Sequence, residues 1–146
     1  DVERSRGLGD VYKRQAKHRP MRLQRICVVD DSSAVRKLAN RVLVQQLGKE
    51  LIESTNGFQA LDVINTNMPD ACFIDVEMPE LNGLQLVSMI RANPKFEKMP
   101  IAMLSGASSI FDQEKGLIVG ADLYITKPFS KDSIEQALLT MEGLHE

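Results

Sequence analysis

Residues 26–31 read Ile-Cys-Val-Val-Asp-Asp, and residues 71–75 read Ala-Cys-Phe-Ile-Asp. In both stretches four consecutive apolar residues predict a buried strand, and an acidic residue follows it directly. Shorter or weaker apolar runs at 51–55, 101–104 and 123–125 predict three more strands. Amphipathic stretches separate these runs, which is typical of a parallel sheet covered by helices. We therefore predict an α/β fold with a doubly wound, five-stranded parallel sheet in a three-layer sandwich.

The stretches between the predicted strands carry apolar residues at helical spacing. Ser32 or Ser33 is expected to cap the first helix, which ends at Leu47 before Gly48. Ser130 is expected to cap the last helix. The apolar positions that define the five predicted helices fall within 35–47, 60–64, 84–90, 111–119 and 134–141.

Length and charge limit the classes of protein to which the chain can belong. Its 146 residues, 43% of them hydrophobic, suffice for one core of ordinary size, so we expect one domain. A net charge of -2 gives no general support for binding to nucleic acid or to a membrane. No apolar run reaches the roughly 18 residues that span a bilayer, and no secretory signal is recognisable. We expect a cytoplasmic protein with a protein or small-ligand partner.

Two cysteines, Cys27 and Cys72, lie inside apolar runs without the spacing of a zinc site. Each precedes an aspartate by three residues, on strands that are expected to be neighbours, so the two thiols are expected to lie close together. A disulfide between adjacent parallel strands would be strained. We therefore predict two buried, reduced thiols in a reducing compartment.

Five polar residues follow the carboxyl ends of four predicted strands: Asp30, Asp31, Asp75, Ser105 and Lys127. Ligands of such sheets bind outside these ends, where the strand order reverses, so the five side chains are expected to converge. Taken singly, each residue has an ordinary structural role, such as capping a helix or ending a strand. Their joint occurrence favours a binding site, because core packing does not require it.

The chemistry of these side chains indicates phosphoryl transfer. Three carboxylates at close range repel one another unless a cation neutralises them, and hard oxygen ligands suit Mg²⁺. Asp31 and Asp75 are the best direct ligands, with Asp30 acting through a water molecule. An Mg²⁺ ion with open positions supports phosphoryl transfer, with Lys127 and Ser105 contacting the phosphoryl oxygens. An aspartate can then act as the nucleophile and form an acyl phosphate.

Several motifs resemble those of the bacterial response-regulator receiver domain, over the stretch from Arg25 to about Leu144. They are Val-Val-Asp30-Asp31-Ser, Ile-Asp75-Val-Glu-Met78-Pro79, Asn82-Gly83, Leu-Ser105-Gly-Ala and Lys127-Pro128-Phe129. The resemblance implies a CheY-like, flavodoxin-like fold. It also implies that the chain is a signalling protein rather than an enzyme, with Mg²⁺-dependent self-phosphorylation and self-dephosphorylation.

Carried over to this sequence, the resemblance makes Asp75 the phosphoacceptor, supplied by a histidine kinase or a histidine phosphotransfer protein. Asp30, Asp31, Asp75 and the backbone carbonyl of Glu77 would hold Mg²⁺. Phosphorylation would then switch binding of a downstream motility or regulatory protein, with no role for nucleic acid or membrane in this domain.

The same resemblance assigns the remaining site residues. Lys127 and Ser105 become the phosphoryl contacts, with Ser105 at a position where the family often has Thr. Tyr124 becomes an aromatic switch, and Lys127-Pro128 a cis peptide. The downstream partner would read the face formed by the helix at 111–119, the strand at 123–125 and the last helix.

Two stretches suggest a subfamily and a boundary. The segments 111–116, 119–122 and 124–131 look like the stand-alone receivers of type IV pilus twitching motility. Residues 5–15, in contrast, resemble one reading frame of a sequencing-library adapter. We expect residues 1–20 to be a disordered tail of artificial origin, with a receiver domain over 21–146 that begins at Met21. A genuine flexible basic tail is the alternative.

Other functions compete with this interpretation. A phosphatase of the haloacid-dehalogenase type also forms an aspartyl phosphate, but its nucleophile follows the first strand and it carries a cap insertion. A pseudo-receiver that acts only as an interaction module would be expected to lose acidic or lysine positions retained here. The third alternative is a receiver fragment of a longer regulator that lost a DNA-binding or enzymatic output domain beyond Glu146.

Overall fold

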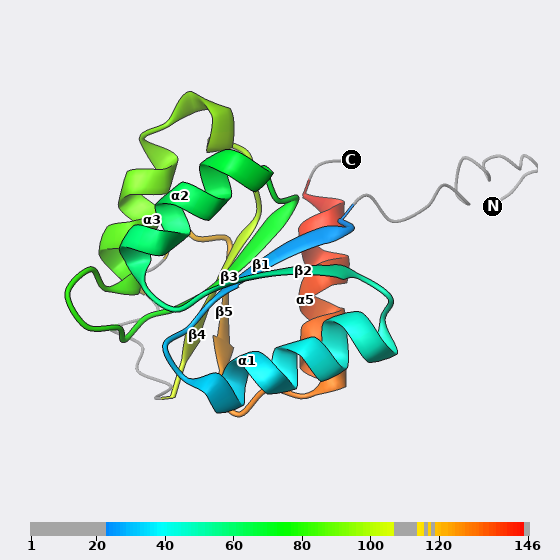
Figure 1. Ribbon diagram of the computed structural model, residues 1–146. Coiled ribbons are helices and arrows are strands. Elements are labelled where there is room, and N and C mark those ends of the chain that lie inside the picture. Colours follow the sequence, from blue (N-terminus) through cyan, green and yellow to red (C-terminus); the bar gives the residue numbers. More distant parts are fainter. Residues whose placement is uncertain (1–22, 107–113, 116, 118, 145–146) are drawn as a thin grey trace, which may run out of the picture.

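The computed structural model describes residues 23–106, 114–115, 117 and 119–144. Its five strands are all parallel and follow the order β2-β1-β3-β4-β5 (Figure 1). The predicted five-stranded parallel sheet is therefore confirmed. The strands are β1 (Arg25–Val29), β2 (Glu50–Ser54), β3 (Ala71–Asp75), β4 (Ile101–Ser105) and β5 (Leu123–Thr126).

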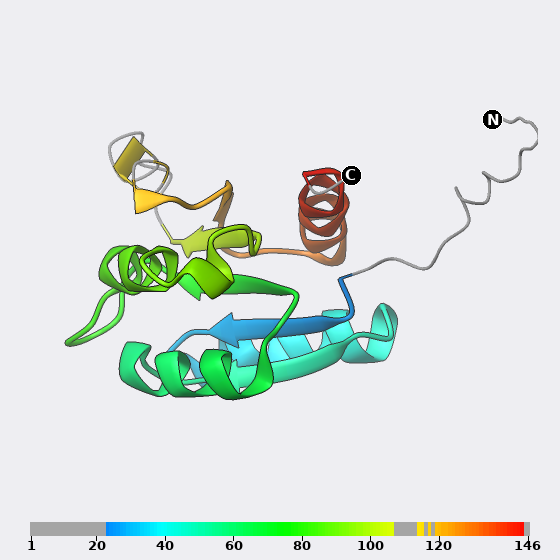
Figure 2. The same cartoon turned by 90° about the horizontal axis from the view of Figure 1, so that it is seen from above.

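Helices cover both faces of this sheet. In Figure 1 the sheet is seen nearly edge-on, with α2 and α3 on one side and α1 and α5 on the other. Seen from above, the blue β1 lies next to the green β3 (Figure 2), as their pairing requires. The helical elements are α1 (Ser33–Ala39), η2 (Asn40–Gln46), α2 (Gly57–Asn67), α3 (Gly83–Arg91), the short η3 (Pro94–Phe96) and α5 (Lys131–Gly143).

The helix predicted over 111–119 falls largely on residues outside the described part of the chain. Four of the predicted helices are confirmed. Among the described residues, no helix is both long and apolar enough to cross a membrane.

Helix ends follow the predicted capping residues. The Ser32 hydroxyl accepts a hydrogen bond from the Val35 amide at 3.3 Å and so caps α1. At α5 the Ser130 hydroxyl accepts from the Ser133 amide, and the Ser133 hydroxyl lies 2.8 Å from the Ser130 amide in return, which completes a capping box. Gly48 ends the first helical segment with φ of +69°, a conformation that glycine adopts without steric cost.

The first helical stretch is not a single α-helix. After Ala39 it widens into η2, where the Leu47 amide donates to the Val42 carbonyl five residues earlier. The sequence predicted one continuous helix because apolar positions at α-helical and π-helical spacing differ little over two turns.

Two apolar cores lie on the two faces of the sheet. One is formed with α2 and α3, and includes Ile64, Leu86 and Ile90. The other is formed with α1, η2 and α5, and includes Leu43 and Leu138. Every residue of β3 and β4 is buried, as expected for central strands covered on both faces.

The two cysteines lie where the sequence predicted. Cys27 of β1 is paired in register with Cys72 of β3, and both thiols are buried and free. A hydrogen bond between the thiols, together with burial, raises the pKa of Cys72 well above its ordinary value. Both residues belong to the core on the α2 and α3 face, so their role is packing.

Gly83 sets the position of the loop that follows β3. Its amide donates to the Val76 carbonyl at 2.9 Å, which brings the start of α3 against the end of β3. A Cβ atom at this position would overlap the Asp75 carbonyl. Only glycine permits this approach, and the Asp75 backbone is thereby held between the sheet and α3.

Candidate functional site

The site lies at the carboxyl end of the sheet, between β1 and β3. Asp30 directly follows β1, and Asp75 is the last residue of β3. These strands are parallel neighbours, and the chain leaves β1 toward β2 on one side while β3 lies on the other. The site therefore occupies the reversal of strand order, where ligands of such sheets bind.

Lys127 links the two aspartates. Its Nζ lies 2.8 Å from Asp30 Oδ2 and 3.1 Å from Asp75 Oδ1. The residue is placed by its own amide, which donates to the Ser105 carbonyl at 2.6 Å. The peptide bond between Lys127 and Pro128 is cis, as the family resemblance implied. One ammonium group thus contacts carboxylates of two different strands.

Asp30 is fully buried and is held by its neighbours. Its Oδ1 accepts the Ser32 amide at 2.9 Å, and its own amide donates to the Ser54 carbonyl at 3.1 Å. Asp31, one residue along, is exposed. Carboxylate oxygens of Asp30, Asp31 and Asp75 all lie within 4.8 Å of one another. The three predicted acidic residues are therefore brought together, one of them open to solvent.

The charges of this cluster do not balance. Three carboxylates face one lysine, so two negative charges remain when all are ionised. Burial, followed by the charge of Asp30, raises the pKa of Asp75 from 3.8 to about 6, against the attraction of Lys127. Burial would lower the pKa of Lys127, but its hydrogen bond to Asp30 and the charge of Asp75 outweigh burial and raise it. An additional cation would relieve the repulsion, and the oxygen-only donor set fits Mg²⁺.

The remaining predicted site residues lie at the end of β4, after β3 and within β5. Ser105 is buried at the end of β4, where its carbonyl receives the Lys127 amide. The exposed Glu77 donates its amide to Asp75 Oδ1 at 3.3 Å. Tyr124 of β5 is partly buried against the α2 and α3 core, and its hydroxyl has no hydrogen-bond partner among the described residues.

One residue near the site was not predicted from the sequence. Arg36 of α1 donates from Nη1 to the Asp30 backbone carbonyl at 2.7 Å. Its Nε also lies 3.3 Å from Glu53 Oε1 on β2. The only sequence signal was a basic residue one turn into the helix that follows an acidic pair, and this pattern is common on solvated helices.

Comparisons with known proteins agree with this geometry. The family model of the response regulator receiver domain matches residues 26–139. Over 114 residues the chain is 40% identical to Protein PilG of Pseudomonas aeruginosa, a match that covers 78% of this chain and 84% of PilG. A chemotaxis protein CheY homolog of Campylobacter jejuni is 35% identical over 124 residues, covering 82% of this chain and 95% of the homolog.

The fold is also similar to that of solved receivers. Chemotaxis protein CheY4 of Vibrio cholerae matches with a TM-score of 0.77 at 28% identity, over 82% of this chain and 98% of CheY4. The sequence match and the fold match therefore both cover most of the chain, and the residues matched by the family model include Asp30, Asp75 and Lys127. The chain belongs to the response regulator receiver domain family.

Proposed function

We propose that this receiver accepts a phosphoryl group on Asp75 in a Mg²⁺-dependent reaction and passes the signal on by switching partner binding. The observation that carries the proposal is the position of Lys127, which contacts Asp30 and Asp75 at once beside the third carboxylate of Asp31. This arrangement provides a nucleophile, a cation for phosphoryl oxygens and oxygen ligands for a metal ion.

In the proposed reaction a carboxylate oxygen of Asp75 attacks the phosphorus of a phosphohistidine. The new oxygen–phosphorus bond forms as the bond from phosphorus to the donor nitrogen breaks, and the electron pair leaves with the imidazole. With a pKa of about 6, Asp75 is mostly ionised at neutral pH and therefore available as a nucleophile. Water later attacks the phosphorus, the bond between phosphorus and the Asp75 oxygen breaks, and inorganic phosphate leaves with the carboxylate restored.

The surrounding residues would neutralise and orient the transferred group. Bound Mg²⁺ would supply charge neutralisation for the phosphoryl oxygens. We assign Asp30, Asp31, Asp75 and the Glu77 carbonyl to metal binding. Lys127, already 3.1 Å from Asp75 Oδ1, would contact a phosphoryl oxygen.

We further propose that Ser105 and Tyr124 transmit the change. The Ser105 hydroxyl would bind a phosphoryl oxygen, and Tyr124 would respond on the next strand. The affected surface would then include β5 and α5, where a downstream motility or regulatory protein would bind. The phosphodonor would be a histidine kinase or a histidine phosphotransfer protein.

Several observations bear on the alternatives. Retention of Asp30, Asp31, Asp75 and Lys127 in one cluster favours an active receiver over a pseudo-receiver. A nucleophile at the end of β3, instead of after β1, disfavours the haloacid-dehalogenase type of phosphatase. We propose a stand-alone receiver, as the lengths of PilG and the CheY homolog suggest by analogy, rather than a fragment of a longer regulator. A twitching-motility role is proposed from the motifs at 111–116, 119–122 and 124–131.

The test is phosphorylation by a small-molecule donor. Purified protein is incubated with acetyl phosphate, with Mg²⁺ or with EDTA, and the phosphorylated fraction is measured on a Phos-tag gel. We expect Mg²⁺-dependent phosphorylation that Asp75→Asn abolishes and Lys127→Ala strongly reduces. Asp62→Asn, which removes an exposed carboxylate of α2, is the control and should behave as the wild type. Undiminished phosphorylation of the Asp75→Asn variant would contradict the assignment.

A further inference from the structure

We propose that Arg36 is a positioning residue for the metal-binding carboxylates, because it holds the peptide group that joins Asp30 to Asp31. The inference rests on the proposed Mg²⁺ site. It concerns a residue that contacts neither the reacting atoms nor, by its chemistry, a cation.

Arg36 donates a hydrogen bond to the peptide group that joins Asp30 to Asp31. The Asp30 carbonyl accepts this hydrogen bond from Arg36 Nη1 at 2.7 Å. It belongs to the same planar peptide group as the Asp31 amide. The orientation of this plane sets the direction in which the Asp31 side chain leaves the backbone. Asp31 is exposed, so packing contributes little to holding it.

Arg36 also ties this peptide to the sheet. Its Nε lies 3.3 Å from Glu53 Oε1, and Glu53 precedes Ser54, whose carbonyl receives the Asp30 amide. The Asp30 backbone is thus held on its amide side by the end of β2 and on its carbonyl side by Arg36. Only 18% of the Arg36 side chain is exposed, whereas most arginines of surface helices are solvated. Such contacts to the groups behind metal ligands commonly tune metal affinity.

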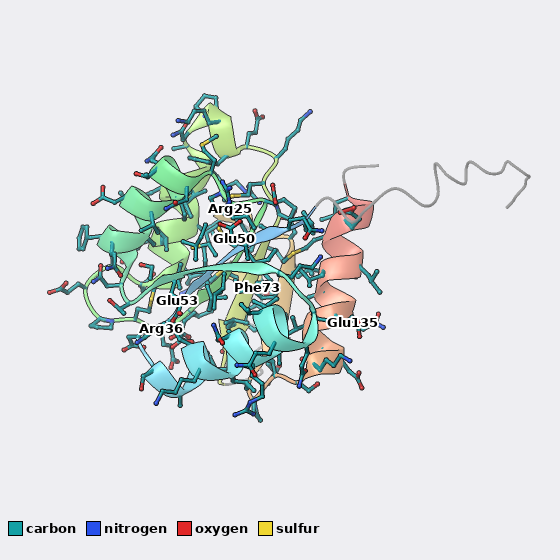
Figure 3. The ribbon with its side chains drawn as sticks, turned by 45° about the vertical axis from the view of Figure 1, so that its right-hand side comes forward. Arg25, Arg36, Glu50, Glu53, Phe73 and Glu135 are labelled. Atoms are coloured by element: carbon teal, nitrogen blue, oxygen red, sulfur yellow. The ribbon has the colours of Figure 1, made fainter. Side chains whose placement is uncertain are left out.

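A second arginine, Arg25 of β1, makes the same two kinds of contact far from the site. Arg25 Nε lies 3.4 Å from Glu50 Oε1, and Arg25 Nη1 donates to the Asn67 carbonyl at 2.6 Å. Each arginine therefore joins one glutamate of β2 and one backbone carbonyl. Figure 3 shows the two pairs at opposite ends of β2. Arg25 lies five residues before Asp30 on β1, about 16 Å away at about 3.3 Å per residue.

Charge and positioning predict opposite effects at Arg36. Removing a positive charge close to a cation site should strengthen Mg²⁺ binding if Coulomb interaction alone acts. Removing a group that holds the Asp30–Asp31 peptide should weaken binding, because the free protein then populates unsuitable orientations of Asp31. The sign of the change therefore separates the two explanations.

The experiment is titration with Mg²⁺ by isothermal titration calorimetry at pH 7.5 and fixed ionic strength, on the full chain. Variants are Arg36→Gln, Arg36→Lys and the control Arg25→Gln, each with its melting temperature measured in EDTA. We expect Kd for Mg²⁺ to rise by about ten- to a hundredfold in Arg36→Gln. Arg36→Lys keeps the charge but has one ammonium for two partners, so its Kd should lie in between. Arg25→Gln should stay within twofold of the wild type.

Three results for the variants would overturn the inference. Wild-type affinity or tighter binding in Arg36→Gln would overturn the inference, as would an equal loss in Arg25→Gln. Wild-type affinity in Arg36→Lys would mean that the two contacts of the guanidinium are not needed to hold the peptide, and would overturn the inference too. If Arg36→Gln does not fold, Arg36→Lys decides. Failure of the wild type to bind Mg²⁺ would instead overturn the proposed function itself, and the inference with it.

Discussion

At neutral pH the Asp75 side chain, of which only 6% is exposed, carries a negative charge next to a second buried carboxylate, Asp30. Its pKa is raised from 3.8 to about 6 by burial, then by Asp30, and Lys127 opposes the shift. An acid whose pKa is higher in the folded state binds more protons when folded than when unfolded. The contribution of Asp75 to folding stability therefore falls as the pH rises between about 4 and 6, and the loss is complete above that range.

We predict that Asp75→Asn stabilises the metal-free protein at pH 7.5, because it removes this unfavourable charge. A pKa shift of this size corresponds to about 2–3 kcal/mol, or roughly 5–10 °C in melting temperature. The gain should shrink as the pH is lowered to 4.5. Thermal melting by circular dichroism in EDTA measures it, with Asp62→Asn as the control for simple loss of charge. A constant or absent difference across this range would show that burial does not govern Asp75.

The site aspartates and lysine predicted from the sequence lie at strand ends, whereas Arg36, which was not predicted, comes from a helix. Asp30, Asp75 and Lys127 are far apart in sequence, yet each lies at or just after the carboxyl end of a strand, and one edge of a parallel sheet brings such residues together. Arg36 reaches the Asp30 carbonyl through the rotation of α1 about its axis. No local pattern encodes that rotation, so the contact could not be predicted.

At the scale of helices and strands, the serines that cap α1 and α5 were predicted correctly from the sequence. We predict that Ser130→Ala lowers the free energy of unfolding by about 1 kcal/mol, because it removes the hydroxyl that accepts the Ser133 amide of α5. Urea denaturation monitored by circular dichroism measures the change. Thr140→Ala, at an exposed position within the same helix, is the control and should be neutral or slightly stabilising, because alanine has a higher helix propensity than threonine. An equal effect in both variants would mean that the cap contributes nothing specific.

The prediction at the level of elements was less accurate where backbone geometry departs from a regular helix. Helix ends are defined by side-chain chemistry: the hydroxyls of Ser32 and Ser130 accept backbone hydrogen bonds, and Gly48 adopts a positive φ because it has no side chain. All three predicted helix ends are confirmed. The widening of the helix into η2 depends on which carbonyl each amide selects, as Leu47 selects that of Val42. Apolar spacing does not determine that choice.

For the whole molecule, the parallel sheet with helices on both faces follows from the alternation of apolar runs and amphipathic stretches, and the domain boundary stays a prediction. We expect a chain that starts at Met21 to melt within a few degrees of the full chain, because residues 1–20 carry no apolar periodicity. Differential scanning calorimetry of both proteins tests this. A loss of several kcal/mol, a large share of the roughly 5–15 kcal/mol typical of a domain, would show that the first twenty residues belong to the fold.

The central claim, that Asp75 accepts the phosphoryl group, is tested most directly by locating the modification. The protein is treated with acetyl phosphate and Mg²⁺, the acyl phosphate is reduced with borohydride, and the peptides are sequenced by tandem mass spectrometry. We predict one Mg²⁺-dependent reduced aspartate, at position 75, in the peptide that contains Met78 and Pro79. A reduced residue at Asp30 or Asp31 in its place, or no acyl phosphate in the presence of Mg²⁺, would contradict the account.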